Sequence, residues 1–168
     1  RILLAEDDMK TRFLIELMLH FHKFQVDLAE EGKAALNLAC NNRYYAILID
    51  LSLQGLNGIE VCNLIKQYQT QQNFSNPSPI IGLAENIQKL ELDNCFEIGI
   101  DAVLIKPLSS QSLDNLLISI DKKLSRERFI TDSIDLNNYT DSMKKSKSMG
   151  FKTLKQNTDE YYKNKRSS

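Results

Sequence analysis

Short apolar runs and amphipathic stretches alternate five times along the first 125 residues of this chain. The apolar runs are typical of strands buried on both faces, and they cover Ile2–Ala5, Phe24–Ala29, Tyr45–Ile49, Ile80–Leu83 and Ala102–Ile105. The stretches that follow them repeat apolar residues with helical spacing, and they cover Met9–Phe21, Gly32–Ala39, Ile59–Tyr68, Ile87–Ile98 and residues 113–124. This alternation predicts right-handed crossovers and one parallel sheet covered by helices on both faces.

The first predicted helix carries many apolar residues. Phe13, Leu14, Leu17, Met18 and Phe21 fall on one helical face. This spacing indicates an amphipathic helix.

Residues 126–168 do not continue the pattern. They are polar, rich in Lys, Ser, Asn and Asp, and mildly basic, whereas the first 125 residues are acidic. Their apolar residues are too sparse for a second core. We therefore expect one domain at residues 1–125 and a linker or tail at residues 126–168 that is partly helical or disordered, or that belongs to a truncated neighbouring domain. Residues 136–162 would fit the opening helix of such a domain.

Composition narrows the class of protein. The chain is 42% hydrophobic and 26% charged, with a net charge of −1, which is ordinary for a water-soluble domain. Its three cysteines are widely spaced, so we expect free thiols rather than disulfides or a metal site. No run approaches the ~18 apolar residues of a membrane span. No dense basic block indicates nucleic-acid contact, and the lack of a Gly-x-x-x-x-Gly-Lys motif excludes a P-loop enzyme.

Charged residues stand where three of the apolar runs stop. Asp7 and Asp8 follow the first run, Asp50 the third and Lys106 the fifth. The carboxyl ends of adjacent parallel strands form the crevice where ligands bind. Three carboxylates gathered there would repel one another unless a divalent cation neutralised them, and Mg²⁺ prefers oxygen ligands with a substrate phosphate. With Lys106 as a point charge for phosphoryl oxygens, the pattern indicates phosphoryl chemistry on a carboxylate.

These motifs resemble the receiver domain of two-component response regulators, the CheY-like family. The resemblance rests on Glu6-Asp7-Asp8, on Asp50-Leu51-Ser52-Leu53-Gln54-Gly55-Leu56-Asn57-Gly58 and on Lys106-Pro107. Each motif follows its own predicted strand, and together they span roughly residues 1–125. The resemblance implies a flavodoxin-like, doubly wound parallel sheet of five strands in the order 2-1-3-4-5, with five helices.

The resemblance also implies a role for each matched residue. Asp50 would be the phosphorylated nucleophile, and Lys106 would pair with the phosphoryl group. Mg²⁺ would be held by the carboxylates of Asp7, Asp8 and Asp50 and by the backbone carbonyl of Ser52. Pro107 would follow Lys106 through a cis peptide bond. Two alternatives stay open: Asp8 could instead cap the following helix, and Glu6 could be a neighbour of the site or purely structural.

Two positions depart from the family pattern. The family has Thr or Ser at the end of the fourth strand, where this chain has Ala84, and an aromatic residue in the fifth strand, where it has Val103. Losing the hydroxyl removes one hydrogen bond, about 0.5–1.5 kcal/mol net. We therefore expect phosphorylation to survive and its structural readout to weaken. Ser52 and Asn86 stand where the family tunes the access of water to the phosphoryl group.

The implied partner is a histidine kinase or a phosphotransfer domain, in a cytoplasmic phosphorelay or on the cytoplasmic side of a membrane-anchored hybrid kinase. A receiver dimer through the surface of the fourth helix and fifth strand is a further expectation. The alternative function is a receiver-like adaptor that binds proteins without phosphorylation. A haloacid dehalogenase-type hydrolase is disfavoured because Ser52 stands where that family needs an acid. No kinase catalytic core and no DNA-binding output domain are visible in the sequence.

Overall fold

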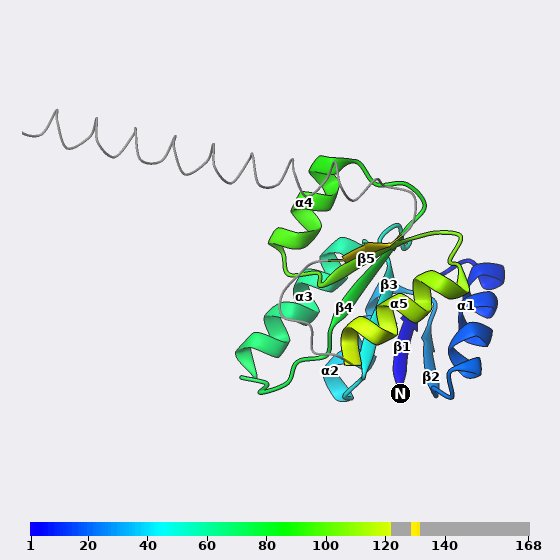
Figure 1. Cartoon of the computed structure of the whole chain (residues 1–168). Helices are drawn as coiled ribbons and strands as arrows, with labels where there is room; N and C mark the ends of the chain where they lie inside the picture. The colour runs from blue at the N-terminus through cyan, green and yellow to red at the C-terminus, as the bar shows by residue number, and fades with distance from the viewer. Residues whose placement is uncertain (122–128, 132–168) are drawn as a thin grey trace, which may run out of the picture. The chain divides into compact units, whose positions relative to one another are not determined.

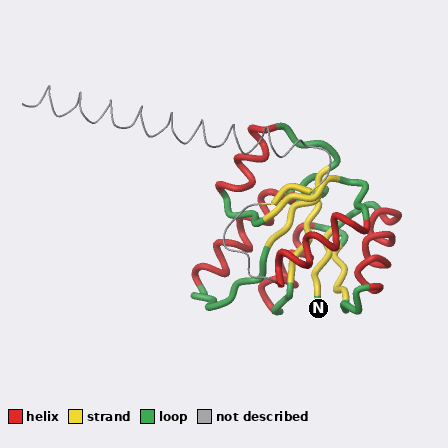
Figure 2. The backbone as a smooth tube through the Cα atoms, viewed as in Figure 1, coloured by secondary structure: helices red, strands yellow, loops and turns green. Residues whose placement is uncertain are grey.

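The computed structural model describes residues 1–121 and 129–131, which build a single parallel sheet with helices on both sides (Figures 1 and 2). The strands are β1 (Ile2–Ala5), β2 (Val26–Ala29), β3 (Ala46–Asp50), β4 (Ile80–Ala84), β5 (Ala102–Ile105) and β6 (Phe129–Thr131). The helices are α1 (Met9–Phe21), α2 (Gly32–Asn41), α3 (Gly58–Gln71), α4 (Lys89–Glu97) and α5 (Ser110–Asp121). None of the described helices is long and apolar enough to cross a membrane.

The strand order is β2-β1-β3-β4-β5-β6, and every neighbouring pair is parallel. This arrangement confirms the predicted order 2-1-3-4-5 and the five helices. The sixth strand was not predicted, and it lies in the segment that the sequence assigned to the tail. It is only three residues long, too short to show a period. The predicted helix at residues 136–162 lies outside the described residues.

The core on one face of the sheet shows the period of two expected of strands. Alternate strand residues pack there against Ile15 and Leu19 of α1 and against Leu113, Leu116 and Leu117 of α5. These strand residues are Ile2, Leu4, Ala46, Leu48, Ile81, Leu83, Ala102 and Leu104. The period of two continues past the end of each strand. It therefore determines which side chains at the carboxyl edge of the sheet lie on this face.

Helix α1 turns most of its predicted apolar face to solvent. Phe13, Leu14, Leu17 and Phe21 are exposed, whereas Ile15 and Leu19 are buried and Met18 packs at the margin of the core. The helix carries apolar residues on nearly all sides, so the sequence period could not tell which side meets the sheet. We call the exposed residues Met9, Phe13, Leu14, Leu17 and Phe21 the α1 stripe. They are five of the seven large apolar side chains exposed on the described residues.

All three cysteines are free, as their spacing predicted. Cys62 and Cys95 are buried, and burial raises the pKa of both thiols. Neither thiol is therefore primed for thiolate chemistry.

Candidate functional site

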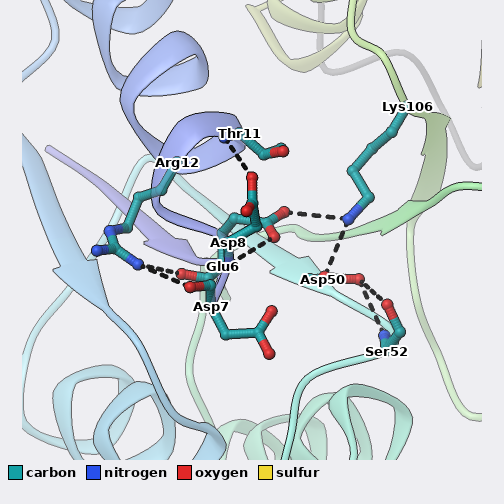
Figure 3. A network of polar contacts seen from close by, with 8 residues as sticks. All are labelled: Glu6, Asp7, Asp8, Thr11, Arg12, Asp50, Ser52 and Lys106. Carbon is teal, nitrogen blue, oxygen red and sulfur yellow. Dashed lines mark hydrogen bonds and ion pairs between the residues drawn. The ribbon is translucent and has the colours of Figure 1, made fainter.

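Three strands deliver charged side chains to one place at the carboxyl edge of the sheet (Figure 3). In each of these strands a core leucine is followed two positions later by a charged residue on the same side, namely Leu4 by Glu6, Leu48 by Asp50 and Leu104 by Lys106. Two residues bring the chain back to the same face of a strand. The charged cluster is therefore the continuation of the core pattern past the last apolar residue.

Asp50 is the best-connected carboxylate of this cluster. Its Oδ1 accepts hydrogen bonds from the Ser52 backbone N–H at 2.9 Å and from the Ser52 hydroxyl at 2.8 Å. Its Oδ2 accepts one from the Lys106 ammonium at 3.0 Å. Burial alone would raise the pKa of Asp50, but the hydrogen bonds from Ser52 and Lys106 outweigh it and lower the pKa below its usual value. Asp50 is therefore ionised at neutral pH although only 2% of its surface is exposed.

Glu6 is a second, fully buried carboxylate beside Asp50. Its Oε2 lies 3.3 Å from the Lys106 ammonium, and its Oε1 accepts a hydrogen bond from the Asp8 backbone N–H at 3.3 Å. Burial and the nearby negative charge of Asp50 raise the pKa of Glu6 to about 6. The sequence left the role of Glu6 open. Counting two residues on from Leu4 along the same face of the strand would have found it.

The carboxylates of Glu6, Asp7 and Asp50 form a group that fits a divalent cation. Each offers one oxygen, and the three oxygens lie within 4.8 Å of one another. Hard carboxylate oxygens at this spacing suit Mg²⁺. Asp7 is partly exposed, so the group is open on one side.

Asp8 stands apart from that group. Its Oδ1 accepts a hydrogen bond from the Thr11 backbone N–H at 2.8 Å and caps α1. The side chain is exposed, and the capping bond lowers its pKa. The structure thus has the capping contact that the sequence left open, and a metal-binding role for Asp8 stays a prediction.

The other predicted positions lie on β4 and β5 or just beyond them. Ala84 ends β4 and is buried, with no hydroxyl, and its carbonyl accepts a hydrogen bond from the Lys106 backbone N–H at 2.7 Å. Val103 is fully buried on the face of β5 opposite Ala102 and Leu104. Asn86 is exposed beyond β4. The Lys106–Pro107 peptide bond is cis, as the resemblance implied.

Gly58 lets α3 begin directly beside Asp50. A Cβ atom at this position would lie 2.0 Å from the Asp50 carbonyl oxygen and 2.8 Å from the Cα of Leu51. Only glycine permits this approach of backbone to backbone. The requirement comes from space rather than from an unusual φ angle.

Sequence reasoning missed Arg12. Its guanidinium hydrogen-bonds the backbone carbonyls of Glu6 and Asp7 and pairs with Glu30. No sequence motif distinguishes this arginine from any other arginine in the first turn of a helix.

Comparison with known proteins gives a consistent result. A family model described as the response regulator receiver domain matches residues 2–118. The response regulator ArlR of Staphylococcus saprophyticus is 32% identical over 127 residues, which cover 76% of this chain and 53% of that protein. ArlR of Staphylococcus haemolyticus is 30% identical, with 67% of this chain and 48% of that protein covered. The chain spans about half the length of these relatives.

Solved structures show the same likeness. The receiver domain of the sensor histidine kinase PA1611 from Pseudomonas aeruginosa is 32% identical, with a TM-score of 0.61 over 69% of this chain and 92% of that one. That structure has a magnesium ion coordinated in the active-site cleft. The receiver domain of Ssk1 from Saccharomyces cerevisiae, crystallised with the phosphotransfer protein Ypd1, gives 25% identity and a TM-score of 0.66, with 70% of this chain and 86% of that one covered. CheY4 of Vibrio cholerae, at 23% identity and a TM-score of 0.63 over 71% of this chain and 96% of that one, shares the fold.

Proposed function

Because the chain belongs to the response regulator receiver domain family of two-component signalling, we propose that Asp50 accepts the phosphoryl group of a phosphohistidine on a histidine kinase or phosphotransfer domain. One observation carries this proposal. Asp50 is buried yet ionised at the end of β3, with Lys106 on one carboxylate oxygen and Ser52 on the other. A buried carboxylate that is kept charged in this way is able to act as a nucleophile, which supports the proposal.

The chain's own residues supply position and charge. An Asp50 oxygen attacks phosphorus as the phosphorus–nitrogen bond of the donor breaks, and the electron pair of that bond stays on the imidazole nitrogen. Lys106, whose pKa is raised by Asp50 and Glu6 in spite of its burial, remains protonated and offsets charge on the phosphoryl oxygens. The protein holds these groups in place before the donor arrives, so little reorganisation is needed during transfer.

Mg²⁺ is the cofactor that the site fits. Glu6, Asp7 and Asp50 would hold it, together with the backbone carbonyl of Ser52, and Asp8 is kept as a sequence-based candidate. When bound, the ion neutralises the carboxylates and the phosphoryl oxygens. The magnesium-containing Pseudomonas receiver supports the choice of metal.

The readout of phosphorylation is proposed to be weak. No hydroxyl stands at Ala84 to follow the phosphoryl group, and Val103 has no ring to swing inward. Both side chains are buried and small, so neither can make a movement as large as that of a ring. Ser52 hydrogen-bonds Asp50, and Asn86 lies two residues beyond β4; both are exposed, and they would set how fast water removes the phosphoryl group.

The α1 stripe is the proposed docking surface for the phosphohistidine protein. Helix α1 begins at Met9, two residues after Asp7 of the acidic group, so we expect a donor that covers Asp50 to cover the start of this helix as well. Exposed apolar patches of this kind on a single domain mark interaction sites. The complex of the yeast Ssk1 receiver with Ypd1 supports a phosphotransfer protein as the partner.

A receiver dimer through α4 and β5 is a further proposal. Strand β6 already pairs with the outer edge of β5, so such a dimer would have to use helix surfaces instead of that edge. The setting proposed for the whole protein is a cytoplasmic phosphorelay, as a response regulator or as the receiver of a hybrid kinase.

Phosphorylation by a small acyl phosphate, with and without Mg²⁺, tests the proposed function. We expect the wild type to take up phosphate only with Mg²⁺, and Asp50→Asn to take up none. Asp114→Asn is the matched control, since Asp114 pairs with His22 away from the site, and it should behave as wild type. If the wild type neither takes up phosphate nor binds Mg²⁺, the proposal fails and the adaptor function replaces it.

The same experiment can address the readout. Ala84→Thr, alone and with Val103→Tyr, would restore the hydroxyl and the ring. We expect the restored variants to gain phosphorylation-dependent changes in amide NMR shifts across α4 and β5 that the wild type lacks. Equal changes in wild type and variants would show that the readout is not weakened.

A further inference from the structure

Arg12 hydrogen-bonds the backbone of Glu6 and Asp7, which carry two of the three clustered carboxylates. Its Nη1 donates to the carbonyl oxygen of Glu6 at 2.8 Å and to that of Asp7 at 3.3 Å, and its Nη2 donates to Glu30 Oε1 at 2.8 Å (Figure 3 shows the two carbonyl contacts). The Arg12 side chain is 12% exposed, whereas that of Glu30 is 71% exposed. One nearly buried side chain thus ties the start of α1, the end of β1 and the end of β2 together.

The position of these contacts decides what Arg12 can do. None of its described contacts is to a carboxylate of the acidic group, since it reaches only the carbonyls behind Glu6 and Asp7. Residue Glu6 is held in the sheet through its own N–H, which donates to the Ala29 carbonyl at 3.1 Å. Beyond Glu6 the chain leaves the hydrogen-bonded sheet. There the Arg12 guanidinium holds the next two peptide groups through the carbonyl oxygens of Glu6 and Asp7. Those peptide groups set the directions in which the Glu6 and Asp7 side chains leave the backbone.

From this geometry we propose that Arg12 is a positioning residue for the divalent-cation site. It holds the carboxylates of Glu6 and Asp7 where they and Asp50 share one ion, without itself touching the ion or the phosphoryl group. This inference rests on the proposed function, because it needs the acidic group to bind Mg²⁺. Residues behind metal ligands typically change metal affinity 10–100-fold when they are replaced.

The charge of Arg12 and its positioning role would change Mg²⁺ affinity in opposite directions. Removing the side chain therefore shows which of the two dominates. If Arg12 acted only through its charge, removing that charge would relieve repulsion and tighten Mg²⁺ binding. If it acts by position, removing it loosens the two carboxylates and weakens binding. Lysine keeps the charge but lacks the planar fork that reaches two carbonyls and a carboxylate at once. Arg12→Lys should therefore fail to rescue the affinity.

Mg²⁺ binding to the full chain, measured by titration calorimetry on unphosphorylated protein, tests the proposal. We expect Arg12→Gln and Arg12→Lys each to weaken Mg²⁺ binding by about tenfold. Lys10→Gln is the charge control, because Lys10 lies in the same turn of α1 and is exposed; it should bind Mg²⁺ at least as tightly as wild type. Thermal unfolding of each variant in chelator shows whether the fold is kept.

Glu30→Gln provides a second variant that spares the buried carbonyl contacts. It should weaken Mg²⁺ binding about two- to threefold in the wild type and should add nothing in the Arg12→Gln background, if Glu30 acts through Arg12. Wild-type affinity in both Arg12→Lys and Arg12→Gln, tighter binding in Arg12→Gln, or an undiminished Glu30→Gln effect without Arg12 would each overturn the proposal. A wild type that binds no Mg²⁺ would overturn the proposed function as well.

Discussion

Glu6 and Asp50 are neighbouring carboxylates whose pKa values shift in opposite directions. Asp50 has two donors from Ser52 as well as Lys106, and its pKa falls; Glu6 is more completely buried and faces the charge of Asp50, and its pKa rises to about 6. Pairs of acids pushed apart in this way are typical of sites with divided roles. Under the proposed function, Asp50 would stay charged to react, and Glu6 would gain most from a bound cation.

The raised pKa of Glu6 predicts how the stability of the metal-free protein depends on pH. The folded state holds the Glu6 proton more tightly than the unfolded state, so this contribution to stability is complete below the ordinary pKa of 4.5 and is lost as the pH rises through about 6. Asp50 acts oppositely, with a contribution that is complete above 3.8 and is lost as the pH falls below that value. The loss from Glu6 is about 1 kcal/mol after allowance for screening by water and ions.

Chemical denaturation in chelator, at pH values from below 4.5 to above 6, measures this effect. Glu6→Gln cannot titrate, so its stability should lack the decline through that range. The difference between the two curves isolates the part of the pH dependence that requires Glu6. Parallel curves would contradict the assigned shift.

At the scale of the element, α1 shows what periodicity can and cannot tell. The sequence placed the helix at the residues where the structure has it, but the face it marked out contains the exposed residues Phe13 and Phe21 rather than the buried Ile15 and Leu19. A helix with apolar residues on several sides has no unique core face in its pattern. The α1 stripe, whose apolar residues led the sequence pattern to the wrong face, is the surface proposed to dock the phosphohistidine protein.

Replacing Phe13 or Phe21 with Ser should separate docking from chemistry. Both side chains are more than 60% exposed, so the change in folding stability should stay within about 0.5 kcal/mol. Loss of an aromatic anchor should cost more than 1 kcal/mol of binding, so transfer from a phosphorylated histidine phosphotransfer protein should slow about tenfold. Phosphorylation by a small acyl phosphate should be unchanged.

The control for this prediction is Ile118→Ser. Ile118 is the exposed apolar residue of α5, with 49% of its surface accessible, and lies outside the α1 stripe. Its replacement should leave transfer from both donors as in wild type. If the α1 variants slowed both donors equally, the stripe would be supporting the site rather than docking a partner.

At the scale of the whole molecule, the order of the strands and the place of the site followed from the sequence because the apolar runs are buried completely. Runs such as Ala46–Asp50 and Ile80–Ala84 are buried at every position, and only a sheet covered on both faces produces such runs. The convergence of Asp50 and Lys106 followed from that sheet. Arg12 and β6 did not, because the first acts through backbone carbonyls and the second is three residues long.

The folded domain has two possible C-terminal boundaries. The sequence suggests a boundary at residue 125, whereas the ladder between β5 and β6 carries the sheet to Thr131. A chain ending at Asp132 should unfold at the same midpoint as the full chain. A chain ending at Ser125 lacks β6, and losing a few ladder hydrogen bonds, about 1–2 kcal/mol net, should lower the midpoint by about 3–8 °C. Thermal unfolding of the three chains measures this, and equal midpoints for all three would assign the domain to residues 1–125.

The Lys106 ammonium joins parts of the chain that are made at very different times. It contacts Glu6, 100 residues earlier in the sequence, and Asp50, 56 residues earlier. During synthesis Asp50 leaves the ribosome well before Lys106, and domains fold as units once their sequence is available. Until β5 has paired with β4, Asp50 lacks the Lys106 ammonium that contacts it. A nascent or prematurely terminated chain that ends before Lys106 thus carries Asp50 without its lysine, and under the proposed function it would lack a complete site.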